Sequence, residues 1–260
     1  MQGIQIFTHS VRQVFGNLGP ALRISGLLTL VQFAMIFVLG VQVIFSPDGG
    51  RAMMLAGTYP TGRVAIYVLL SMIIGLWIAV AWHRYVLREE DSGGLIPKWH
   101  GDRIWAYFTK SFLSGLAIGV AAVVVGLVIG LIVAVLFHDA AATRGNVATV
   151  SIVTVLLTVV PIIYIFFRLC PALPAAALGE PLGLRDAWRL MAGKGGTIFV
   201  LALVSVIVGI VFSRGPAYLL GLEGLPALMW DGVVQWLNTI IGISIMTTLY
   251  GHYVEGRPLV

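Results

Sequence analysis

The sequence predicts an all-α fold of the membrane class, a polytopic helix bundle with six transmembrane helices and amphipathic helices at the membrane surface. The first observation behind this prediction is composition, since 59% of the 260 residues are hydrophobic and only 10% are charged. A water-soluble domain could not cover such a chain with polar surface. The second observation is a series of long charge-free runs, each near the roughly 20 residues that a helix needs to cross a bilayer.

Six charge-free runs are predicted to be the transmembrane helices. A segment in hydrocarbon has to satisfy its own backbone hydrogen bonds, and these runs lack the alternating pattern of a barrel strand, so helices are expected. We expect residues 1–260 to form a single transmembrane domain. The runs are Ser25–Phe45, Val64–Trp82, Phe112–Phe137, Val147–Phe167, Thr197–Phe212 and Val233–Tyr250.

Lysines and arginines are distributed unevenly between the two sides of the predicted bundle. Twelve of the 16 fall in the N-terminal segment, the second and fourth loops and the C-terminal tail, and the other loops hold four. Because cytoplasmic loops carry the excess of positive charge, both termini are predicted to be cytoplasmic. The net charge of +5 then reflects this topology and attraction to anionic lipid, and no nucleic-acid partner is expected.

Three stretches share a layout that suggests an internal repeat: a basic and aromatic amphipathic stretch, a break at small residues, and a membrane helix. The predicted units are residues 1–88, 89–180 and 181–260. In the first stretch an apolar stripe is expected to lie in the membrane interface, with a helix that packs on neighbouring loops as the alternative. The stripe comprises Ile4, Phe7, Val11, Val14, Phe15 and Leu18.

Small residues recur along one face of the third predicted helix, in the sequences GLAIG and GLVIG. Such a face lets another backbone approach closely, and we expect the partner within the same chain or, alternatively, in a second copy as a homo-oligomer. In the fourth helix Pro161 is expected to cause a kink, and the helix should end near Arg168. The small residues of the third helix are Gly115, Gly119, Gly126 and Gly130.

Catalytic and metal-binding patterns are missing from the sequence. The five histidines are isolated, no serine lies in a nucleophile elbow, and MAGKGGT lacks the spacing of a phosphate-binding loop. The predicted helices have no charged residue or histidine near their centres, which disfavours an ion-coupled transporter. We therefore expect no enzyme activity, no catalytic residue, no metal and no cofactor.

The sequence AWHRYVLREE, residues 81 to 90, places aromatic and basic side chains at the membrane border. The first interpretation is an anchor, in which tryptophan joins an aromatic belt and arginine extends to phosphate headgroups. The second is an anionic-lipid site, and the third is catalysis. Against the lipid site, Arg185 and Arg189 are alternatively expected to pair with Glu180 or Asp186 in their own loop. The hypothesised headgroup residues are Arg84, Arg168 and Arg189, with Trp82 and Trp188 fixing the depth.

Two short motifs, WHRYVL at Trp82–Leu87 and PALPAAALGEPLGLRDAW at Pro171–Trp188, resemble bacterial inner-membrane proteins of unknown function. Those proteins are related to the membrane domain found beside glycerophosphodiester phosphodiesterases. The resemblance implies a polytopic domain of the bacterial inner membrane without the soluble barrel, whose roughly 250 residues no segment here could supply. Together with the residues above, it favours a non-enzymatic, lipid-associated or scaffolding protein with membrane lipids, and a membrane protein or a second copy, as partners. A transporter or channel for a small or amphiphilic solute is the alternative.

Overall fold

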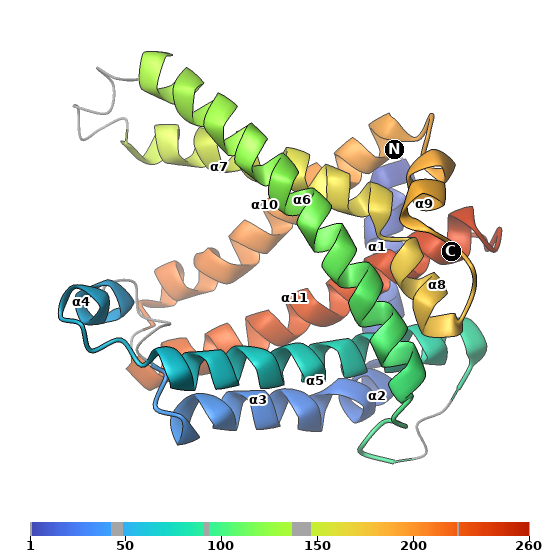
Figure 1. The fold of residues 1–260 in the computed structure, drawn as a ribbon, viewed down its shortest axis with the longest axis horizontal. Coiled ribbons are helices and arrows are strands. Elements are labelled where there is room, and N and C mark those ends of the chain that lie inside the picture. Colours follow the sequence, from blue (N-terminus) through green and yellow to red (C-terminus); the bar gives the residue numbers. More distant parts are fainter. Residues whose placement is uncertain (1, 43–48, 91–93, 137–146, 223, 260) are drawn as a thin grey trace.

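The structure is a computed structural model, and it describes residues 2–42, 49–90, 94–136, 147–222 and 224–259 (Figure 1). Every regular element in these ranges is a helix, as the sequence predicted. Within the same ranges, six helical segments are long and apolar enough to cross a membrane, which confirms the architecture of a multi-pass membrane protein. They are Leu18–Val38, Thr61–Arg88, Gly101–Val135, Val153–Leu178, Gly195–Ser213 and Gly224–Tyr253.

Five of the predicted runs coincide with one long helix each, and the helices continue into charged flanks because arginine and lysine are good helix formers. These helices are α5 (Thr61–Arg88), α6 (Gly101–Leu136), α7 (Val147–Leu169), α10 (Gly195–Leu220) and α11 (Gly224–Tyr253). The end of α7 at Leu169 agrees with the predicted end near Arg168, and Pro161 lies inside this helix.

The helix of the first predicted run begins before Ser25 and is divided. It consists of α2 (Leu18–Ala21), the π-helical turn η1 (Leu22–Gly26) and α3 (Leu27–Val38), of which α2 and most of η1 precede the run. The chain leaves the helix at Gly40, whose φ of +64° suits a glycine and not a residue with a Cβ. The helix therefore ends earlier than the hydrophobic run, whose predicted end at Phe45 lies outside the described residues.

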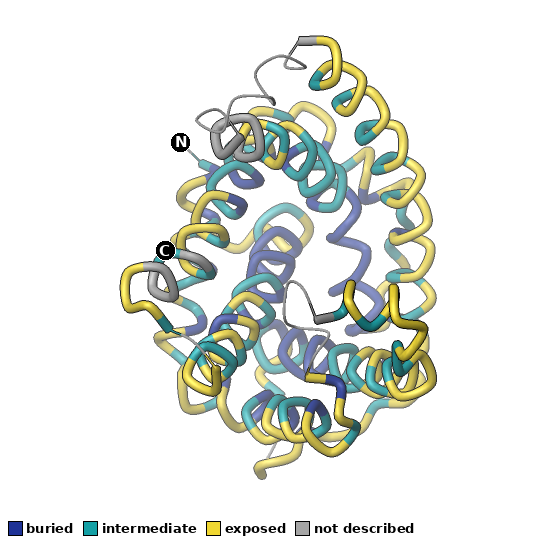
Figure 2. Tube along the Cα trace, turned by 90° about the vertical axis from the view of Figure 1, so that its left-hand side faces the viewer, coloured by how far each residue is buried: buried dark blue, intermediate teal, exposed yellow. Residues whose placement is uncertain are grey.

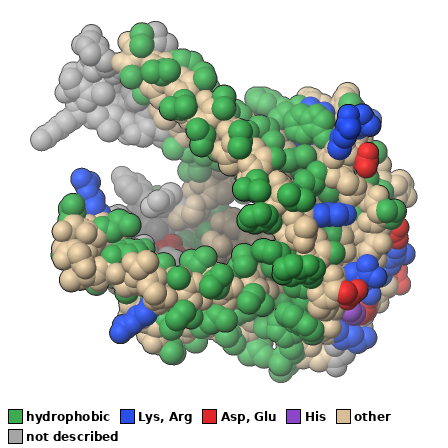
Figure 3. Space-filling view, in the orientation of Figure 1, with side chains coloured by type: hydrophobic (Ala, Val, Ile, Leu, Met, Phe, Trp, Pro, Cys, Tyr) green, Lys and Arg blue, Asp and Glu red, His purple; other side chains and the backbone are tan. Residues whose placement is uncertain are grey.

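The long helices converge at one end of the molecule and spread apart toward the other (Figure 1). The helices α5, α7 and α11 end where they converge, and three shorter helices lie there: α1 (Gln2–Gly16), α8 (Ala172–Leu178) and α9 (Leu184–Leu190). The short α4 (Gly49–Leu55) lies at the opposite end. Charged and histidine side chains gather over the converging end (Figure 3), which we call the charged end.

The core of the protein lies toward the charged end. There α5 is buried continuously from Ile78 to His83 and α11 from Ile243 to Gly251, and every residue of α8 is buried. Figure 2 shows these buried segments inside a ring of more exposed helices. Away from this end the helices expose large apolar side chains, as helices that face lipid do.

The face that α1 buries against the protein is not the apolar stripe, whose place in the membrane interface stays a prediction. Ile4 and Phe15, both members of that stripe, are 49% and 52% exposed. The reason lies at Gly3, where a Cβ would meet the backbone oxygen of Thr197 and lie 2.8 Å from the backbone nitrogen of Leu201. A glycine therefore lets α1 contact the α10 backbone directly and turns this side of α1 inward. The buried residues of α1 are Gly3, Ile6, Ser10 and Val14.

The break expected in the second repeat unit is absent, because α6 runs without interruption from Gly101 to Leu136. Ser114 and Gly115 occupy the position of the expected break, but no proline follows them to remove a backbone hydrogen bond. In the first unit the chain does break, at Asn17 between α1 and α2. The second unit therefore has no separate surface helix. The three-unit repeat stays a prediction.

The small-residue face of α6 has no close neighbour among the described residues. A Cβ built at any of its four glycines would meet no described atom within 4 Å. Close packing at Gly115, Gly119, Gly126 and Gly130, within one copy or between two, therefore stays a prediction.

Candidate functional site

The predicted headgroup residues all belong to the charged end, but the structure separates them into three places. Arg84 lies in a network of ion pairs, Trp82 lies in the core, and Arg168 and Trp188 contact each other beside the exposed Arg189. Each place has a different electrostatic environment, and this decides which of them can receive an anion.

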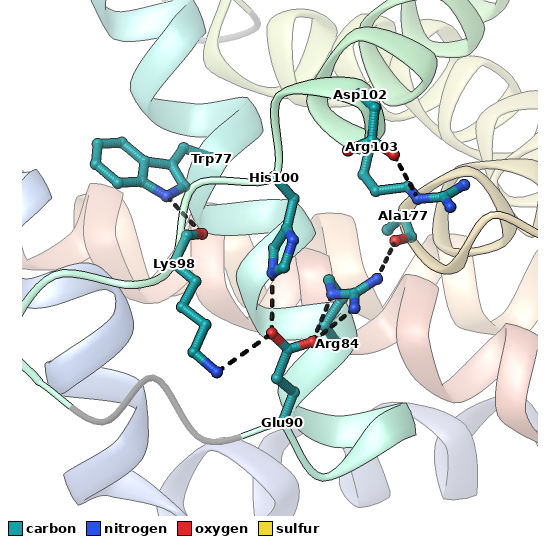
Figure 4. A network of polar contacts seen from close by, with 8 residues as sticks. All are labelled: Trp77, Arg84, Glu90, Lys98, His100, Asp102, Arg103 and Ala177. Atoms are coloured by element: carbon teal, nitrogen blue, oxygen red, sulfur yellow. Dashed lines mark hydrogen bonds and ion pairs between the residues drawn. The ribbon is translucent and has the colours of Figure 1, made fainter.

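Arg84, near the end of α5, binds Glu90 in the following loop (Figure 4). Its Nε donates to Glu90 Oε2 at 2.7 Å, its Nη2 lies 2.7 Å from the same oxygen, and its Nη1 donates to the carbonyl of Ala177 at 3.2 Å. The other carboxylate oxygen lies 2.9 Å from Nε2 of His100 and 3.9 Å from Nζ of Lys98. One carboxylate thereby ties the end of α5 to the segment that leads into α6.

Burial would raise the pKa of Glu90, but hydrogen bonds from Arg84 and His100, together with the nearby charges, outweigh burial and lower it below the usual 4.5. The carboxylate is therefore ionised at neutral pH and balances the Arg84 charge. A lipid phosphate could bind Arg84 only if the partly buried carboxylate of Glu90 lost Arg84 as a partner, which is unfavourable. The geometry thus argues against Arg84 as a headgroup residue.

Arg168, in the last turn of α7, lies over the indole of Trp188 from α9. Its Cζ is 3.8 Å from the ring centroid, a distance at which a cation is attracted to the negative face of the ring. Its Nη2 donates to the Trp188 carbonyl at 3.1 Å, and its buried Nε has no hydrogen-bond partner among the described residues. The guanidinium is oriented and still has donors to offer.

The acidic residues do not neutralise this region as the alternative interpretation expected. Glu180 pairs with Arg88 of α5 at 2.7 Å, and within the described part of the chain neither Arg185 nor Arg189 forms an ion pair. Both arginines are exposed on α9. Arg185 and Arg189 outnumber Asp186 on α9, so positive charge is in excess on the helix that carries Trp188.

Trp82 does not belong to an exposed aromatic belt, and that prediction is wrong. Its side chain is fully buried, and its Nε1 donates to Ser244 Oγ at 2.8 Å. The last turns of α5 are covered by α8 and α11, so the residue faces protein and not the membrane border. Position at the end of a hydrophobic run could not show this, because the covering helices come from later in the sequence.

The residue that the sequence reasoning missed is His83, which is fully buried between α5, α6 and α11. Its Nδ1 lies 2.8 Å from Thr247 Oγ1 and its Nε2 lies 3.3 Å from Tyr107 Oη. Thr247 donates its one hydroxyl hydrogen to the carbonyl of Ile243 at 2.8 Å, so Nδ1 donates to Thr247 and Nε2 accepts from Tyr107. These bonds hold the imidazole in one neutral tautomer and make it a brace between three helices.

No group of three or more His, Cys, Asp or Glu side chains in the described ranges is arranged to hold a metal ion. Comparison of the chain with protein-family models, with curated proteins and with solved structures finds no match. Function is therefore inferred from the residues and their geometry.

Proposed function

We propose that the protein is a non-enzymatic, multi-pass protein of the bacterial inner membrane that holds an anionic phospholipid headgroup at its charged end. The asymmetry of lysine and arginine supports a cytoplasmic position for this end and for both termini. The proposed headgroup residues are Arg168 and Arg189, with Trp188 setting the depth. The observation that carries the proposal is the Arg168 guanidinium, which stacks on Trp188 and has a buried Nε without a partner.

A phosphodiester fits the chemistry of this place. A planar guanidinium binds phosphate oxygens through paired hydrogen bonds, and tryptophan favours the headgroup layer of a membrane. Trp188 is 37% exposed, so one part of the indole supports Arg168 and another part remains accessible. Each basic residue near an anionic surface contributes about 1 kcal/mol, so two would contribute about 2 kcal/mol, roughly a thirtyfold change in affinity.

The membrane-embedded polar residues support a lipid-associated role over the alternative of a transporter. The two ring nitrogens of His83 bond to Tyr107 and Thr247. Trp82 and Ser244 form a similar pair. Polar side chains that are satisfied in this way join helices together, as they commonly do in membrane proteins.

Native mass spectrometry of lipid retention tests the proposal. The protein is extracted from membranes of mixed phosphatidylglycerol and phosphatidylcholine, as wild type and as the double variant Arg168→Gln with Arg189→Gln. The matched control is Arg88→Gln with Arg103→Gln, which removes the same charge at the same end from two arginines that already pair with Glu180 and Asp102.

We expect the Arg168 and Arg189 variant to lose most of its bound phosphatidylglycerol, while the control variant retains it. Equal retention by the two variants would show that net charge, and not the stacked guanidinium, attracts the lipid. That result would end the proposal for this site.

A further inference from the structure

A cavity of about 280 Å³ lies at the charged end, between α1, the ends of α5 and α11, and the C-terminal tail. None of its lining residues belongs to the proposed headgroup site. At roughly 30 Å³ per liquid water molecule, its volume suits a small organic molecule or part of a larger one. The lining residues are His9, Gln13, Val86, Leu87, Thr247, Thr248, Gly251, His252, Arg257, Pro258 and Leu259.

The walls of this cavity combine apolar and polar surface without any acidic residue. Val86, Leu87, Pro258 and Leu259 supply aliphatic surface, whereas the polar surface comes from histidine, glutamine, threonine and arginine. No Asp or Glu is among the lining residues, so the cavity offers no carboxylate to a bound ammonium group. A ligand that fits has an apolar part and a polar part that carries no positive charge.

Two of the nitrogen-bearing residues are already committed to protein partners. His252 Nδ1 lies 2.8 Å from the carbonyl of Arg257 and its Nε2 lies 3.0 Å from Nε2 of Gln2. Both ring nitrogens of His252 are therefore occupied by protein partners. The Arg257 guanidinium bonds to Glu255 at 2.6 Å and to the carbonyls of Val86 and Leu87 at 3.3 and 2.8 Å.

Gln13 is different, because its buried Oε1 has no hydrogen-bond partner among the described residues. Buried amide oxygens in folded proteins are nearly always paired, so this acceptor indicates a donor that the described residues do not supply. Thr248 also lines this cavity, and its hydroxyl already accepts a hydrogen bond from Ser10 at 2.9 Å.

We infer that this cavity binds an uncharged amphiphile that carries at least one hydroxyl group. The ligand hydroxyl donates to Gln13 Oε1, and its apolar chain packs against Leu87, Pro258 and Leu259. A hydroxyl satisfies both requirements of the site, since it donates a hydrogen bond and needs no counter-ion. A carboxylate would bring no donor for Gln13, and an ammonium would lack an acidic partner. A free alcohol and a hydroxylated lipid headgroup share this chemistry.

The test uses the full chain in phosphatidylcholine nanodiscs, with hexane-1,2-diol as the probe and saturation-transfer NMR as the readout. Hexanoate and hexylammonium are probes of the same length with opposite charges, and empty nanodiscs give the background. The variant is Gln13→Leu. Its matched control is Gln5→Leu, the same change at an exposed position of the same helix.

We expect the diol to bind in preference to both charged probes. Gln13→Leu should weaken diol binding about fivefold, the effect of one lost hydrogen bond, and Gln5→Leu should leave it unchanged. The melting temperature of Gln13→Leu should not fall, because the change removes an unpaired buried oxygen. A second variant, Leu259→Trp, places a larger side chain in the cavity and should also reduce diol binding. This variant tests the inference independently if Gln13→Leu does not fold.

Equal diol binding by wild type and Gln13→Leu, or preference for either charged probe, would overturn the inference. A further arm identifies the source of the natural ligand. If diacylglycerol, an uncharged lipid with one free hydroxyl, abolishes diol binding when it is added to the nanodiscs, the hydroxylated end of a neutral lipid occupies the cavity. If binding is unchanged, the ligand is a soluble molecule of the same chemistry.

Discussion

His83 shows how one polar residue joins the buried ends of three helices. In the sequence it lies between Trp82 and Arg84 at the border of a hydrophobic run, where an exposed position is the ordinary expectation. In the structure its ring nitrogens contact Tyr107 of α6 and Thr247 of α11. A buried polar network of this kind stabilises only while every member has its partner.

We predict that His83→Ala lowers the free energy of unfolding by about 3 kcal/mol, because it creates a cavity and removes the partner of the buried Tyr107 hydroxyl. Tyr107→Phe removes one hydrogen bond without changing the volume much, and should lower it by about 1 kcal/mol. Unfolding in mixed micelles with increasing dodecyl sulfate measures both. A His83→Ala variant as stable as Tyr107→Phe would contradict the role of the imidazole as a brace.

Glu90 makes the charged end sensitive to pH. Its pKa is lowered below 4.5 in the folded protein by the hydrogen bonds and charges that overcome its burial. A carboxylate with a lowered pKa stabilises the fold fully above its unfolded pKa, and this contribution is lost as the pH falls through the folded pKa. The ion pair with Arg84 is 20% and 22% exposed at its two side chains, so the contribution belongs at the upper end of the range for surface pairs.

Glu90→Gln should therefore lower the free energy of unfolding at pH 7 by about 1 kcal/mol. The difference from wild type should shrink below pH 4.5, where Glu90 itself becomes protonated in the wild type. Unfolding curves at pH 7 and at intervals down to pH 3 provide the measurement. Glu89→Gln is the control, since it removes the same charge from an exposed neighbour. A constant difference across this pH range would be inconsistent with the Glu90 network.

At the scale of elements, the contact between α1 and α10 depends on the absence of one side chain. A Cβ at Gly3 would overlap the backbone of α10, whereas one at Gly16, at the other end of α1, would meet no described atom within 4 Å. The two glycines look equivalent in sequence. Only their different distances from a neighbouring helix separate their roles.

We predict that Gly3→Ala destabilises the protein by about 2 kcal/mol, because α1 has to move away from α10 or distort it. Gly16→Ala should change stability by less than about 0.5 kcal/mol. Thermal unfolding of both variants in the same detergent gives the comparison. If Gly3→Ala and Gly16→Ala melt together, α1 does not rest on the α10 backbone.

The helix α6 is the least covered of the long helices, since none of its most hydrophobic window is buried within the chain. A Cβ added at Gly115, Gly119, Gly126 or Gly130 would meet no described atom within 4 Å, so the small-residue pattern does not by itself identify a contact within the chain. Glycine is common in membrane helices, and the same pattern serves helix contact and lipid exposure alike. The homo-oligomer that the pattern suggested stays a prediction.

For the whole molecule, the distribution of charge agrees with the direction of the helices. Charged side chains gather at the end where α5, α7 and α11 finish, while most of the face between the ends is hydrophobic (Figure 3). A bilayer around this hydrophobic part would leave the charged end in water on one side. The excess of lysine and arginine favours the cytoplasm as that side.

This topology predicts the labelling of single cysteines in intact cells. A cysteine at Thr58, exposed in the loop between α4 and α5, should react with an impermeant thiol reagent added outside. One at Leu95, which is 70% exposed in the loop between α5 and α6, should react only after the membrane is opened. The native Cys170 is buried and provides a low background. Labelling of Leu95→Cys in intact cells would reverse the proposed orientation.

The sequence by itself determined the class of fold, because membrane insertion of a helix depends on the total hydrophobicity of that one segment. Hydrophobicity summed over a run such as Val64–Trp82 predicts a spanning helix wherever its neighbours lie. The end of α7 near Arg168 was predictable for the same local reason, since basic residues and prolines follow the run.

Only the tertiary structure decided which polar residues are exposed, paired or buried. Trp82 and Arg84 lie two positions apart in one helix, yet the first bonds to Ser244 in the core and the second to Glu90 at the surface. Arg168 retains an unpaired Nε because α9 brings an indole and not a carboxylate to it. The partner of Trp82 comes from a distant part of the chain, and the partners of Arg84 and Arg168 come from segments that follow their helices and fold back onto them. Hydropathy and charge spacing along a single helix contain no information about which of these partners it will meet.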